Sequence, residues 1–406
     1  MDNKILPLQG IQVVEFTHMV MGPTAGLILA DLGAEVVKVE PLDGDKTRRL
    51  EGSGAGYFPM YNRNKKSICV DLKSEEGKQL ARRLVKKADV VIENFRLGAM
   101  DRLGLGYEQS SVLNPRLIYC SLKGFLPGPY GSRTALDEVA QMMGGLAYMT
   151  GLPGKPMRAG SSVIDITGGM FGVIGILAAV ERRHKTGLGG MVTSALFETT
   201  VFMMGQHMAQ HAASGEAPMP MSQRQSAWSI YDIFLSREGE SVFIGVVSDT
   251  LWVKFCKAFE LGSFASDATL ATNSGRIKYR DSIMPIITSL FASMSKQELM
   301  DRLELAGIPF APINRPEDLL NETHLEASNG LLPVTLTDGE RVGMQARLPA
   351  LPFEMSDEKF ELRSGLPSEG EHSIEVMRDA GYSADEIDEM LRDGFVKVAV
   401  CGSGTE

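Results

Sequence analysis

Asp165 is the residue whose type and position best suit covalent chemistry. It lies in the segment Gly160–Gly169, between a stretch rich in glycine and proline and a long apolar stretch that predicts a helix. A carboxylate at a helix N-terminus is ionised and accepts hydrogen bonds from backbone amides, and an ionised carboxylate can act as a covalent nucleophile. An N-cap aspartate without any chemistry fits the same position and is the more frequent case. Because two glycines weaken a helix, Gly168 and Gly169 indicate that another group approaches closely there.

Basic and aromatic residues in two segments could hold a nucleotide. The segment Asn62–Ser67 is a local basic cluster in an acidic protein, and Lys73 follows the strand predicted after it. These cations could bind phosphates, although a solvated surface loop is the usual role of such a charge run. In Glu93–Gly98, which follows another predicted strand, Phe95 could face an adenine ring and Arg96 a phosphate. An ordinary loop between a strand and a helix explains that segment equally well.

Other patterns of catalytic or metal-binding residues are weak. His207 and His211 are four residues apart on a predicted helix, but Met, Ala and Gln lie between them, and core or surface histidines are more frequent than ligands. The four cysteines are far apart, so neither a zinc site nor a disulfide framework is expected. The sequence has no P-loop and no Gly-x-Ser-x-Gly motif. We therefore expect no metal site.

Composition and charge narrow the class of protein. With 41 basic and 51 acidic residues the net charge is −10, which argues against a nucleic-acid partner. The 44% of hydrophobic residues suits a large buried core. The N-terminus lacks a basic segment followed by an apolar one, and no run of about 18 apolar residues occurs. Together with the few cysteines, these features predict a cytoplasmic protein without a membrane partner.

Strand-like and helix-like segments alternate in the first half of the chain. This order predicts βαβ units and a Rossmann-like, mostly parallel sheet, which places the protein in the α/β class. Ligands of such sheets bind beyond the carboxyl ends of the strands, so the loops after these strands are candidate binding loops. The predicted strands are 11–16, 36–39, 67–72, 90–92 and 117–121, and the predicted helices between them are 23–32 and 74–87.

The second half of the chain changes pattern after a boundary at Ala217–Pro220. We predict three parts: a large α/β domain over 1–224, a smaller α+β domain over 225–325, and a segment 326–406 that returns to the large domain. Before this boundary we predict helices at 165–183 and 194–213. After it we predict a hairpin over 229–247 and helices at 251–259, 282–306 and 383–392.

Several segments together resemble the class III CoA-transferases, the formyl-CoA transferase and carnitine-CoA transferase type. The resemblance spans nearly the whole chain, and its motifs are specific in combination although no single one is. They are Leu8–Phe16 followed by Gly22-Pro23, Leu32–Pro41, Asn62–Ser67, Asp89–Phe95, the segment Ile164–Gly169 and the C-terminal Gly370-Glu371-His372.

The resemblance implies a fold, a reaction and a set of site residues. Asp165 would be the nucleophile, which attacks an acyl-CoA and then carries CoA as an aspartyl thioester. The donor would be a common acyl-CoA such as succinyl-CoA, and the acceptor a small carboxylic or sulfinic acid. CoA would be a substrate, with no tightly bound cofactor, and the chain would form an interlocked homodimer. The implied CoA-binding residues are Met19, Met21, Val70, Lys73, Asn94, Phe95, Ala99, Arg102 and Leu196, with Arg96 as an addition.

Two departures from the family pattern bear on specificity. Formyl-CoA and oxalate members carry glutamine at the position of Val20 and tyrosine at Leu136, and a glycine-rich loop where this chain has none, around 222–229. The related 2-methylacyl-CoA racemases carry a histidine base at Leu136, and leucine cannot exchange a proton. Transfer is therefore favoured, with a racemase or a non-catalytic CoA-binding protein as alternatives. Candidates for the acid pocket are Met21, Arg48, Tyr57 and the segment 223–225.

Overall fold

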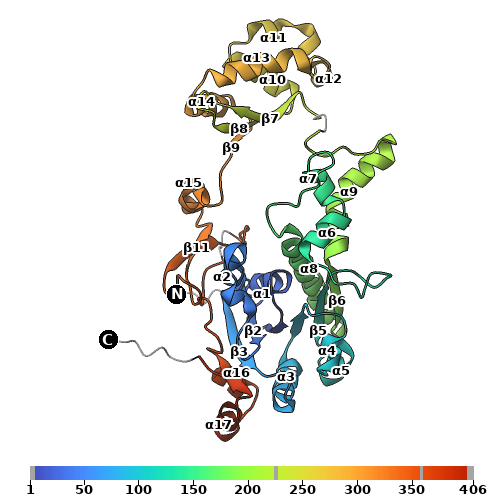
Figure 1. Cartoon of the computed structure of the whole chain (residues 1–406), viewed down its shortest axis with the longest axis vertical. Coiled ribbons are helices and arrows are strands. Elements are labelled where there is room, and N and C mark those ends of the chain that lie inside the picture. The colour runs from blue at the N-terminus through green and yellow to red at the C-terminus, as the bar shows by residue number, and fades with distance from the viewer. Residues whose placement is uncertain (1–4, 224–226, 357–359, 400–406) are drawn as a thin grey trace. The chain divides into compact units, whose positions relative to one another are not determined.

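The computed structural model describes residues 5–223, 227–356 and 360–399. The chain divides into two compact units, one of residues 1–222 with 323–406 and one of residues 223–322 (Figure 1). The first unit is therefore built from both ends of the chain, and the second is a continuous segment inserted between them.

A seven-stranded sheet in the order β12-β3-β2-β1-β4-β5-β6 forms the centre of the first unit. Six strands are parallel, and the short β12 runs antiparallel to β3. Val13 of β1 pairs with Val36 of β2 on one side and with Val90 of β4 on the other. The strands are β1 (Gln12–Phe16), β2 (Glu35–Glu40), β3 (Lys65–Val70), β4 (Val90–Glu93), β5 (Ile118–Lys123), β6 (Gly190–Ala195) and β12 (Val396–Lys397). The predicted α/β class with a mostly parallel sheet is confirmed.

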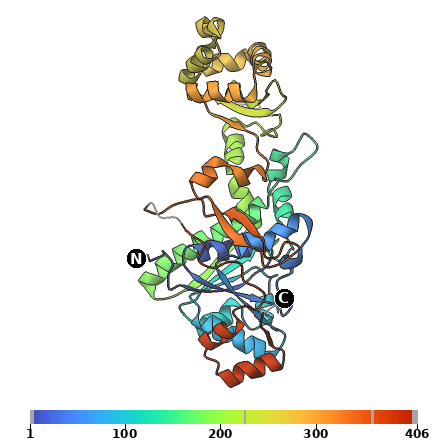
Figure 2. The ribbon, with the colours of Figure 1, turned by 90° about the vertical axis from the view of Figure 1, so that its left-hand side faces the viewer.

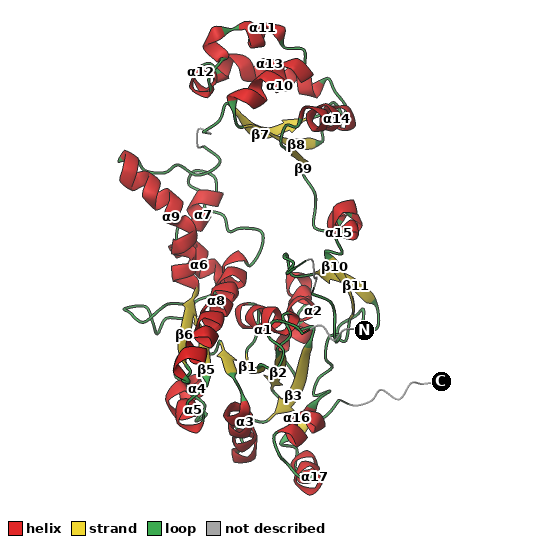
Figure 3. Ribbon diagram, turned by 180° about the vertical axis from the view of Figure 1, so that it is seen from behind, coloured by secondary structure: helices red, strands yellow, loops and turns green. Residues whose placement is uncertain are grey.

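Helices cover both faces of this sheet, which explains the nearly continuous apolar runs of its strands (Figure 3). Helices α1 (Met21–Asp31) and α8 (Val163–Thr186) pack on one face. Helix α3 (Glu75–Lys87) packs on the other with α16 (Ser373–Asp379) and α17 (Ala384–Arg392). The red C-terminal helices thus lie beside α3, although nearly 300 positions of sequence separate them (Figure 1).

The remaining elements of the first unit are mostly short. A two-stranded antiparallel sheet, orange in Figure 2, joins β10 (Leu331–Thr335) to β11 (Gln345–Pro349). Its Val334 packs with Phe58 and Leu366 in a small separate core. The other helices are α2 (Tyr57–Tyr61), α4 (Ala99–Arg102), α5 (Tyr107–Leu113), α6 (Asp137–Met143), α7 (Leu146–Thr150), α9 (Leu196–Ser214) and α15 (Thr323–Ala327).

The second unit is an α+β unit with its own aromatic core. The predicted hairpin is present as β7 (Ile230–Leu235) and β8 (Ser241–Val246), and β9 (Phe310–Pro312) pairs with β8. The helix predicted over 282–306 is wrong as a single element, because it ends at Ala292 and a new helix begins after Ser295. The Ser295 side chain accepts a hydrogen bond from the Glu298 amide and so caps the second helix. The helices are α10 (Asp249–Ala258), α11 (Gly262–Ser266), α12 (Asn273–Lys278), α13 (Arg280–Ala292) and α14 (Lys296–Ala306).

Helix α8 is long and apolar enough to cross a membrane by length and composition alone. In the structure its Ile164, Val173 and Ile176 are buried in the core between the sheet and α1. Gly187 ends the helix in the left-handed conformation with φ of 75°. The apolar residues on this face of α8 therefore pack against the sheet and α1.

Candidate active site

The strand order reverses between β1 and β4, and open α/β sheets bind ligands beyond the carboxyl ends of strands at such a point. His18 and Met19 follow β1, and Asn94 and Phe95 follow β4. The structure therefore brings three of the predicted CoA-binding residues, Met19, Asn94 and Phe95, to one edge of the sheet. His18 lies with them and was missed, because no motif in the sequence marks it.

Asn94 uses its side chain to hold the segment that follows β1. Its Oδ1 accepts the His18 amide N–H at 3.0 Å, and its Nδ2 donates to the His18 carbonyl oxygen at 2.8 Å. The His18 Nδ1 lies 3.0 Å from the same Oδ1, so this nitrogen carries the proton. The His18 and Phe95 ring centres are 5.7 Å apart, and Met19 takes a left-handed conformation with φ of 64°. Asn94 thus positions the loop, and His18 is exposed.

Glu93, the last residue of β4, holds the start of the loop that follows this strand. This buried carboxylate accepts hydrogen bonds from Ser121 Oγ at 2.5 Å and from Lys123 Nζ at 2.6 Å. It also accepts the Phe95 amide N–H at 3.0 Å, and Lys123 donates to the Phe95 carbonyl at 2.7 Å. Sequence reasoning gave Glu93 and Lys123 no role, because their contact depends on the pairing of β4 with β5.

The predicted phosphate-binding cations lie at the surface around this edge. Lys73 follows β3, Arg96 follows β4, and Arg102 ends α4, and all three are exposed. Val70, the last residue of β3, is buried, and Ala99 is half-buried at the start of α4. The cations are therefore accessible to a nucleotide, whereas Val70 lies beneath the surface.

Asp165 is the third residue of α8, so the alternative of an N-cap aspartate is wrong. Ser162 occupies the N-cap position and makes no side-chain cap. The Ile164 and Asp165 amides instead donate to Asp137 Oδ2, at 2.8 and 3.1 Å. Among the described residues, none donates a hydrogen bond to the Asp165 carboxylate, contrary to the expected backbone amides. The carboxylate is therefore left to interact with a ligand.

The electrostatics of Asp165 also differ from the expectation of a readily ionised carboxylate. Burial raises its pKa to about 7, and the negative charges of Asp137 and Glu138 add to the effect. The Arg158 guanidinium acts in the opposite direction and lowers the pKa. Burial likewise raises the pKa of Tyr61 to about 12, with the nearby Asp165 charge as the second cause. Desolvation and like charge thus outweigh the favourable helix N-terminus.

Close packing of α1 against α8 explains the two glycines after Asp165. A Cβ at Gly168 would lie 2.7 Å from Met21 Cε and 3.6 Å from Leu196 Cδ2, and one at Gly169 would lie 2.6 Å from the Met21 carbonyl oxygen. The predicted close approach is confirmed, and the approaching groups belong to the protein. Met21 and Leu196 therefore meet one turn after Asp165.

Residues at the positions of the family departures are also placed near this helix. Val20 is buried and packs with Tyr61, Tyr57 and Ile166 in a small apolar cluster. Leu136 precedes α6 and is 60% exposed. Both side chains are hydrocarbons, so neither can hydrogen-bond an acid or move a proton.

The proposed acid-pocket residues separate in the structure. Arg48 is buried and already paired, with Glu40 at 2.7 Å and Asp338 at 2.8 Å. It lines a cavity of about 830 Å³ with the loop around Asp338. Tyr57 and Met21 lie on the Asp165 side, where Tyr57 belongs to the apolar cluster around Tyr61. Within the segment 223–225, residues 224 and 225 lie outside the described residues.

Two of the three cations of the predicted basic cluster are buried and ion-paired, so the cluster does not form a solvated loop. Arg63 is buried against Asp31 at 2.7 Å, and Lys65 is buried against Glu15 at 2.9 Å. Burial lowers the pKa of Lys65 to about 8, against the opposing charge of Glu15. Lys66 is partly exposed and pairs with glutamates near the surface. The cluster therefore anchors β3 inside the unit.

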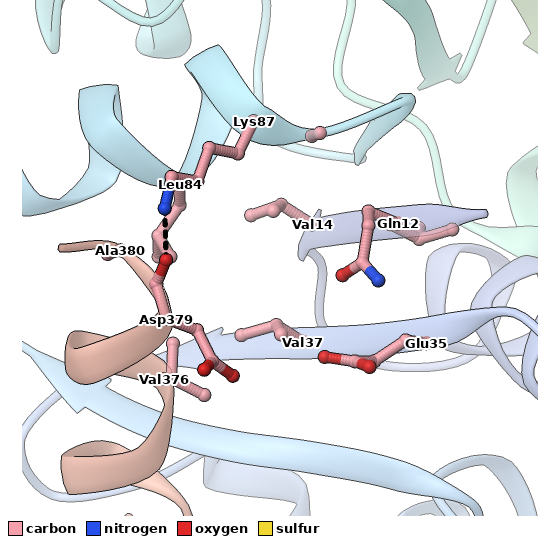
Figure 4. A pocket seen from close by; sticks show the side chains of 11 residues that line it. Gln12, Val14, Glu35, Val37, Leu84, Lys87, Val376, Asp379 and Ala380 are labelled. Atoms are coloured by element: carbon pink, nitrogen blue, oxygen red, sulfur yellow. Dashed lines mark hydrogen bonds between the residues drawn. The ribbon is translucent and has the colours of Figure 1, made fainter. Parts of the chain in front are cut away.

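The opposite edge of the sheet holds a much smaller cavity of about 60 Å³ (Figure 4). Gln12 and Glu35, at the starts of β1 and β2, face Lys87 and Asp379 across it, and Lys87 Nζ donates to the Asp379 carbonyl. This volume is far below the 300–1,000 Å³ or so of a typical small-molecule site. The candidate site is accordingly at the carboxyl edge.

The sequence model of CoA-transferase family III matches residues 8–373. The chain belongs to this family. It is 34% identical over 393 residues to succinate–glutarate CoA-transferase of Agrobacterium fabrum, covering 93% of this chain and 97% of that protein. It is 32% identical over 390 residues to succinyl-CoA:mesaconate CoA-transferase of Haloarcula hispanica, covering 92% and 96%. The predicted resemblance is confirmed.

Solved structures agree with this membership. A CAIB/BAIF family protein from Brucella suis superposes with a TM-score of 0.81 at 33% sequence identity, covering 93% of this chain and 100% of that one. The fold of this family III member therefore matches that of a crystallised relative over nearly its whole length. Its relatives support CoA-transferase activity, with an acyl-CoA as substrate.

Proposed function

We propose that this protein moves CoA from an acyl-CoA to a small organic acid through an aspartyl-CoA thioester on Asp165. The Asp165 carboxylate carries the proposal, because it is partly buried, receives no hydrogen bond from the described residues and has a pKa raised to about 7. An anion that is poorly stabilised by its surroundings is a stronger nucleophile than one in water. The proposed enzyme is an acyl-CoA:carboxylate CoA-transferase.

The exchange divides into balanced covalent steps. An oxygen of the Asp165 carboxylate attacks the thioester carbonyl of the donor, the C–S bond breaks, and a mixed anhydride and CoA thiolate result. The thiolate attacks the Asp165 carbonyl carbon, and the donor acid leaves as a carboxylate. The acceptor carboxylate then attacks the carbonyl carbon of the aspartyl-CoA thioester, and its C–S bond breaks to give a second mixed anhydride and CoA thiolate. This thiolate attacks the acyl carbon that came from the acceptor, and the new acyl-CoA and the free Asp165 carboxylate result. No external oxidant, reductant or net proton transfer is needed.

The CoA moiety would bind at the carboxyl edge of the sheet. The exposed cations suit its phosphates, Phe95 suits its adenine ring, and Met21 and Leu196 lie against Gly168 in the first turns of α8. Asn94 would act by fixing the loop after β1. The proposed contact residues are Met19, Met21, Val70, Lys73, Asn94, Phe95, Arg96, Ala99, Arg102 and Leu196, of which Val70 would contribute through its position at the end of β3.

Relatives suggest which substrates to test first. Their names pair succinate with glutarate and succinyl-CoA with mesaconate. We therefore propose succinyl-CoA as donor and a dicarboxylic acid as acceptor, and a sulfinic acid offers a similar nucleophilic oxygen. The experiment incubates the enzyme with succinyl-CoA and one acid at a time, and measures each new CoA thioester by liquid chromatography and mass spectrometry.

Transfer predicts a new thioester that requires both the acid and Asp165, and Asp165→Asn is the matched control. Exchange of an α-proton with deuterated water without any acceptor acid would instead indicate a racemase. Binding of CoA without a new thioester, across a panel of acyl-CoA donors and acids, would contradict the proposed function.

We also propose that the chain acts as an interlocked homodimer, as the family resemblance implies. A threaded dimer cannot separate without unfolding, so its mass should not fall on dilution. Light scattering over a wide range of concentrations measures this. A monomer mass at any concentration with the chain still folded would contradict it.

A further inference from the structure

The start of α8 depends on a residue from another helix. The first amides of a helix have no partner within it and need one from elsewhere. The N-cap Ser162 does not supply it. Asp137, the first residue of α6, accepts the Ile164 amide at 2.8 Å and the Asp165 amide at 3.1 Å on one oxygen. The backbone of Asp165 itself is therefore tied to the Asp137 carboxylate.

Asp137 is in turn held rigidly. Its side chain is 3% exposed, and its second oxygen accepts a hydrogen bond from the Gln141 amide group. Gln141 also accepts the Ala159 amide N–H at 2.8 Å, which ties the segment before α8 to α6. Arg158 Nη2 lies 3.9 Å from Asp137, and its guanidinium also pairs with Glu138. These contacts orient Asp137 before any substrate binds.

Charges on α6 and on the segment before α8 face Asp165. Asp137 and Glu138 of α6 are negative, and Arg158 of the preceding segment is positive. From α2, Tyr61 lies near enough to sense the Asp165 charge, and this tyrosine is neutral at physiological pH. The two negative charges raise the pKa of Asp165 more than the positive charge of Arg158 lowers it. Both carboxylates also pair with the Arg158 guanidinium.

We propose that Asp137 is a positioning residue for the nucleophile: it fixes the backbone at Asp165 and keeps a negative charge beside the Asp165 carboxylate. Its position sets the direction in which Asp165 attacks, and its charge keeps that carboxylate basic and therefore more nucleophilic. The kinetic consequence rests on the proposed function, whereas the electrostatic consequence can be measured without any substrate.

Two substitutions separate charge from position. Asp137→Asn keeps an oxygen for the two amides and removes the charge, so the pKa of Asp165 should fall by about 1 unit. Asp137→Glu keeps the charge but moves it by one methylene group. In this second variant the pKa of Asp165 should stay raised. The rate of adduct formation at Asp165 should fall by roughly tenfold or more, because the charge and the helix start are displaced.

The first measurement is the titration of the Asp165 side-chain carbon by ¹³C NMR in the full-length, ligand-free protein, assigned by comparison with Asp165→Asn. Glu138→Gln should lower the Asp165 pKa without touching the helix amides, and Arg158→Gln should raise it, because the sign of the removed charge is reversed. These two variants still test the charges around Asp165 if Asp137→Asn does not fold. A merely structural role of Asp137 would leave the Asp165 midpoint of Asp137→Asn at its wild-type value.

An unchanged Asp165 midpoint in folded Asp137→Asn would overturn the electrostatic role of Asp137. Unchanged adduct formation in Asp137→Glu would overturn the positioning role. If the midpoints shift as expected while wild-type protein transfers no CoA, the proposed function fails and the assignment of Asp137 to the Asp165 environment stands. The two failures are therefore distinguishable.

Discussion

Replacing Asp165 with asparagine should stabilise the first unit at neutral and alkaline pH. Burial and the charges of Asp137 and Glu138 raise the pKa of Asp165 from 3.8 to about 7. The folded state therefore holds this proton more tightly than the unfolded state. The stability that comes from the proton is fully present below about pH 4 and is lost as pH rises through 7. Asparagine never ionises, so the variant avoids this loss.

The size of the effect follows from the shift. Moving the pKa from 3.8 to about 7 is worth at most about 4 kcal/mol, at about 1.4 kcal/mol for each pH unit. Because Asp165 is partly exposed, water screens part of this cost, and we expect about 2 kcal/mol at pH 8. Removing the charge of the proposed nucleophile should therefore stabilise the folded protein, as it does at many functional sites.

Urea unfolding of wild type and Asp165→Asn at one protein concentration, between pH 5 and pH 8, measures this difference. The advantage of the variant should grow from pH 5 to about pH 7 and stay constant above it. Asp388→Asn, at an exposed position of α17, is the matched control and should show no such growth. Equal stability of wild type and Asp165→Asn at pH 8, or a less stable variant, would refute the electrostatic account of Asp165.

Three further substitutions test contacts described above. Asn94→Ala releases the segment after β1. In steady-state kinetics the KM for acyl-CoA should rise about tenfold, with a smaller change in kcat. An unchanged KM would contradict the positioning role of Asn94. Gly169→Ala should lower the free energy of unfolding in denaturant by about 1–3 kcal/mol, because its Cβ would lie 2.6 Å from a backbone oxygen of α1. Gly205→Ala is the control, because open space surrounds that position, and it should lose no stability. Lys65→Met removes the nearer of two cations from the buried Glu15 carboxylate and should cost about 3 kcal/mol in the same assay. Lys66→Met, at a partly exposed position, should cost far less, and equal losses would contradict the buried ion pair.

The sheet could be predicted from sequence because its strands are short apolar runs separated by helical segments and glycine. The burial of Lys65 could not, because its partner Glu15 lies 50 positions earlier and meets it only when β1, β2 and β3 pair. A run of charges looks solvated in a sequence, whereas in this fold two of its members are interior. The break before Ser295 was also missed, because apolar periodicity continues across a helix cap.

The candidate site shows the same division. A local pattern, namely a carboxylate at the start of an apolar helix followed by two glycines, singled out Asp165 as a candidate, and the family resemblance implied its role as nucleophile. Asp137, His18 and Glu93 could not, because each acts through a contact with a distant segment. Asn94 was predicted as a ligand contact, and the structure shows its amide engaged with the His18 backbone. The local sequence shows which residue types lie at a site. The tertiary contacts decide which of these side chains already bind other residues of the protein.

The central claim is that Asp165 becomes covalently acylated by the donor. Intact-protein mass spectrometry after incubation with succinyl-CoA and then hydroxylamine tests it directly, because hydroxylamine converts an activated carboxylate into a hydroxamate. We predict a hydroxamate mass shift that maps to Asp165 and is absent from Asp165→Ala. A shift that maps elsewhere, or none with any acyl-CoA in a panel although CoA still binds, would contradict the account.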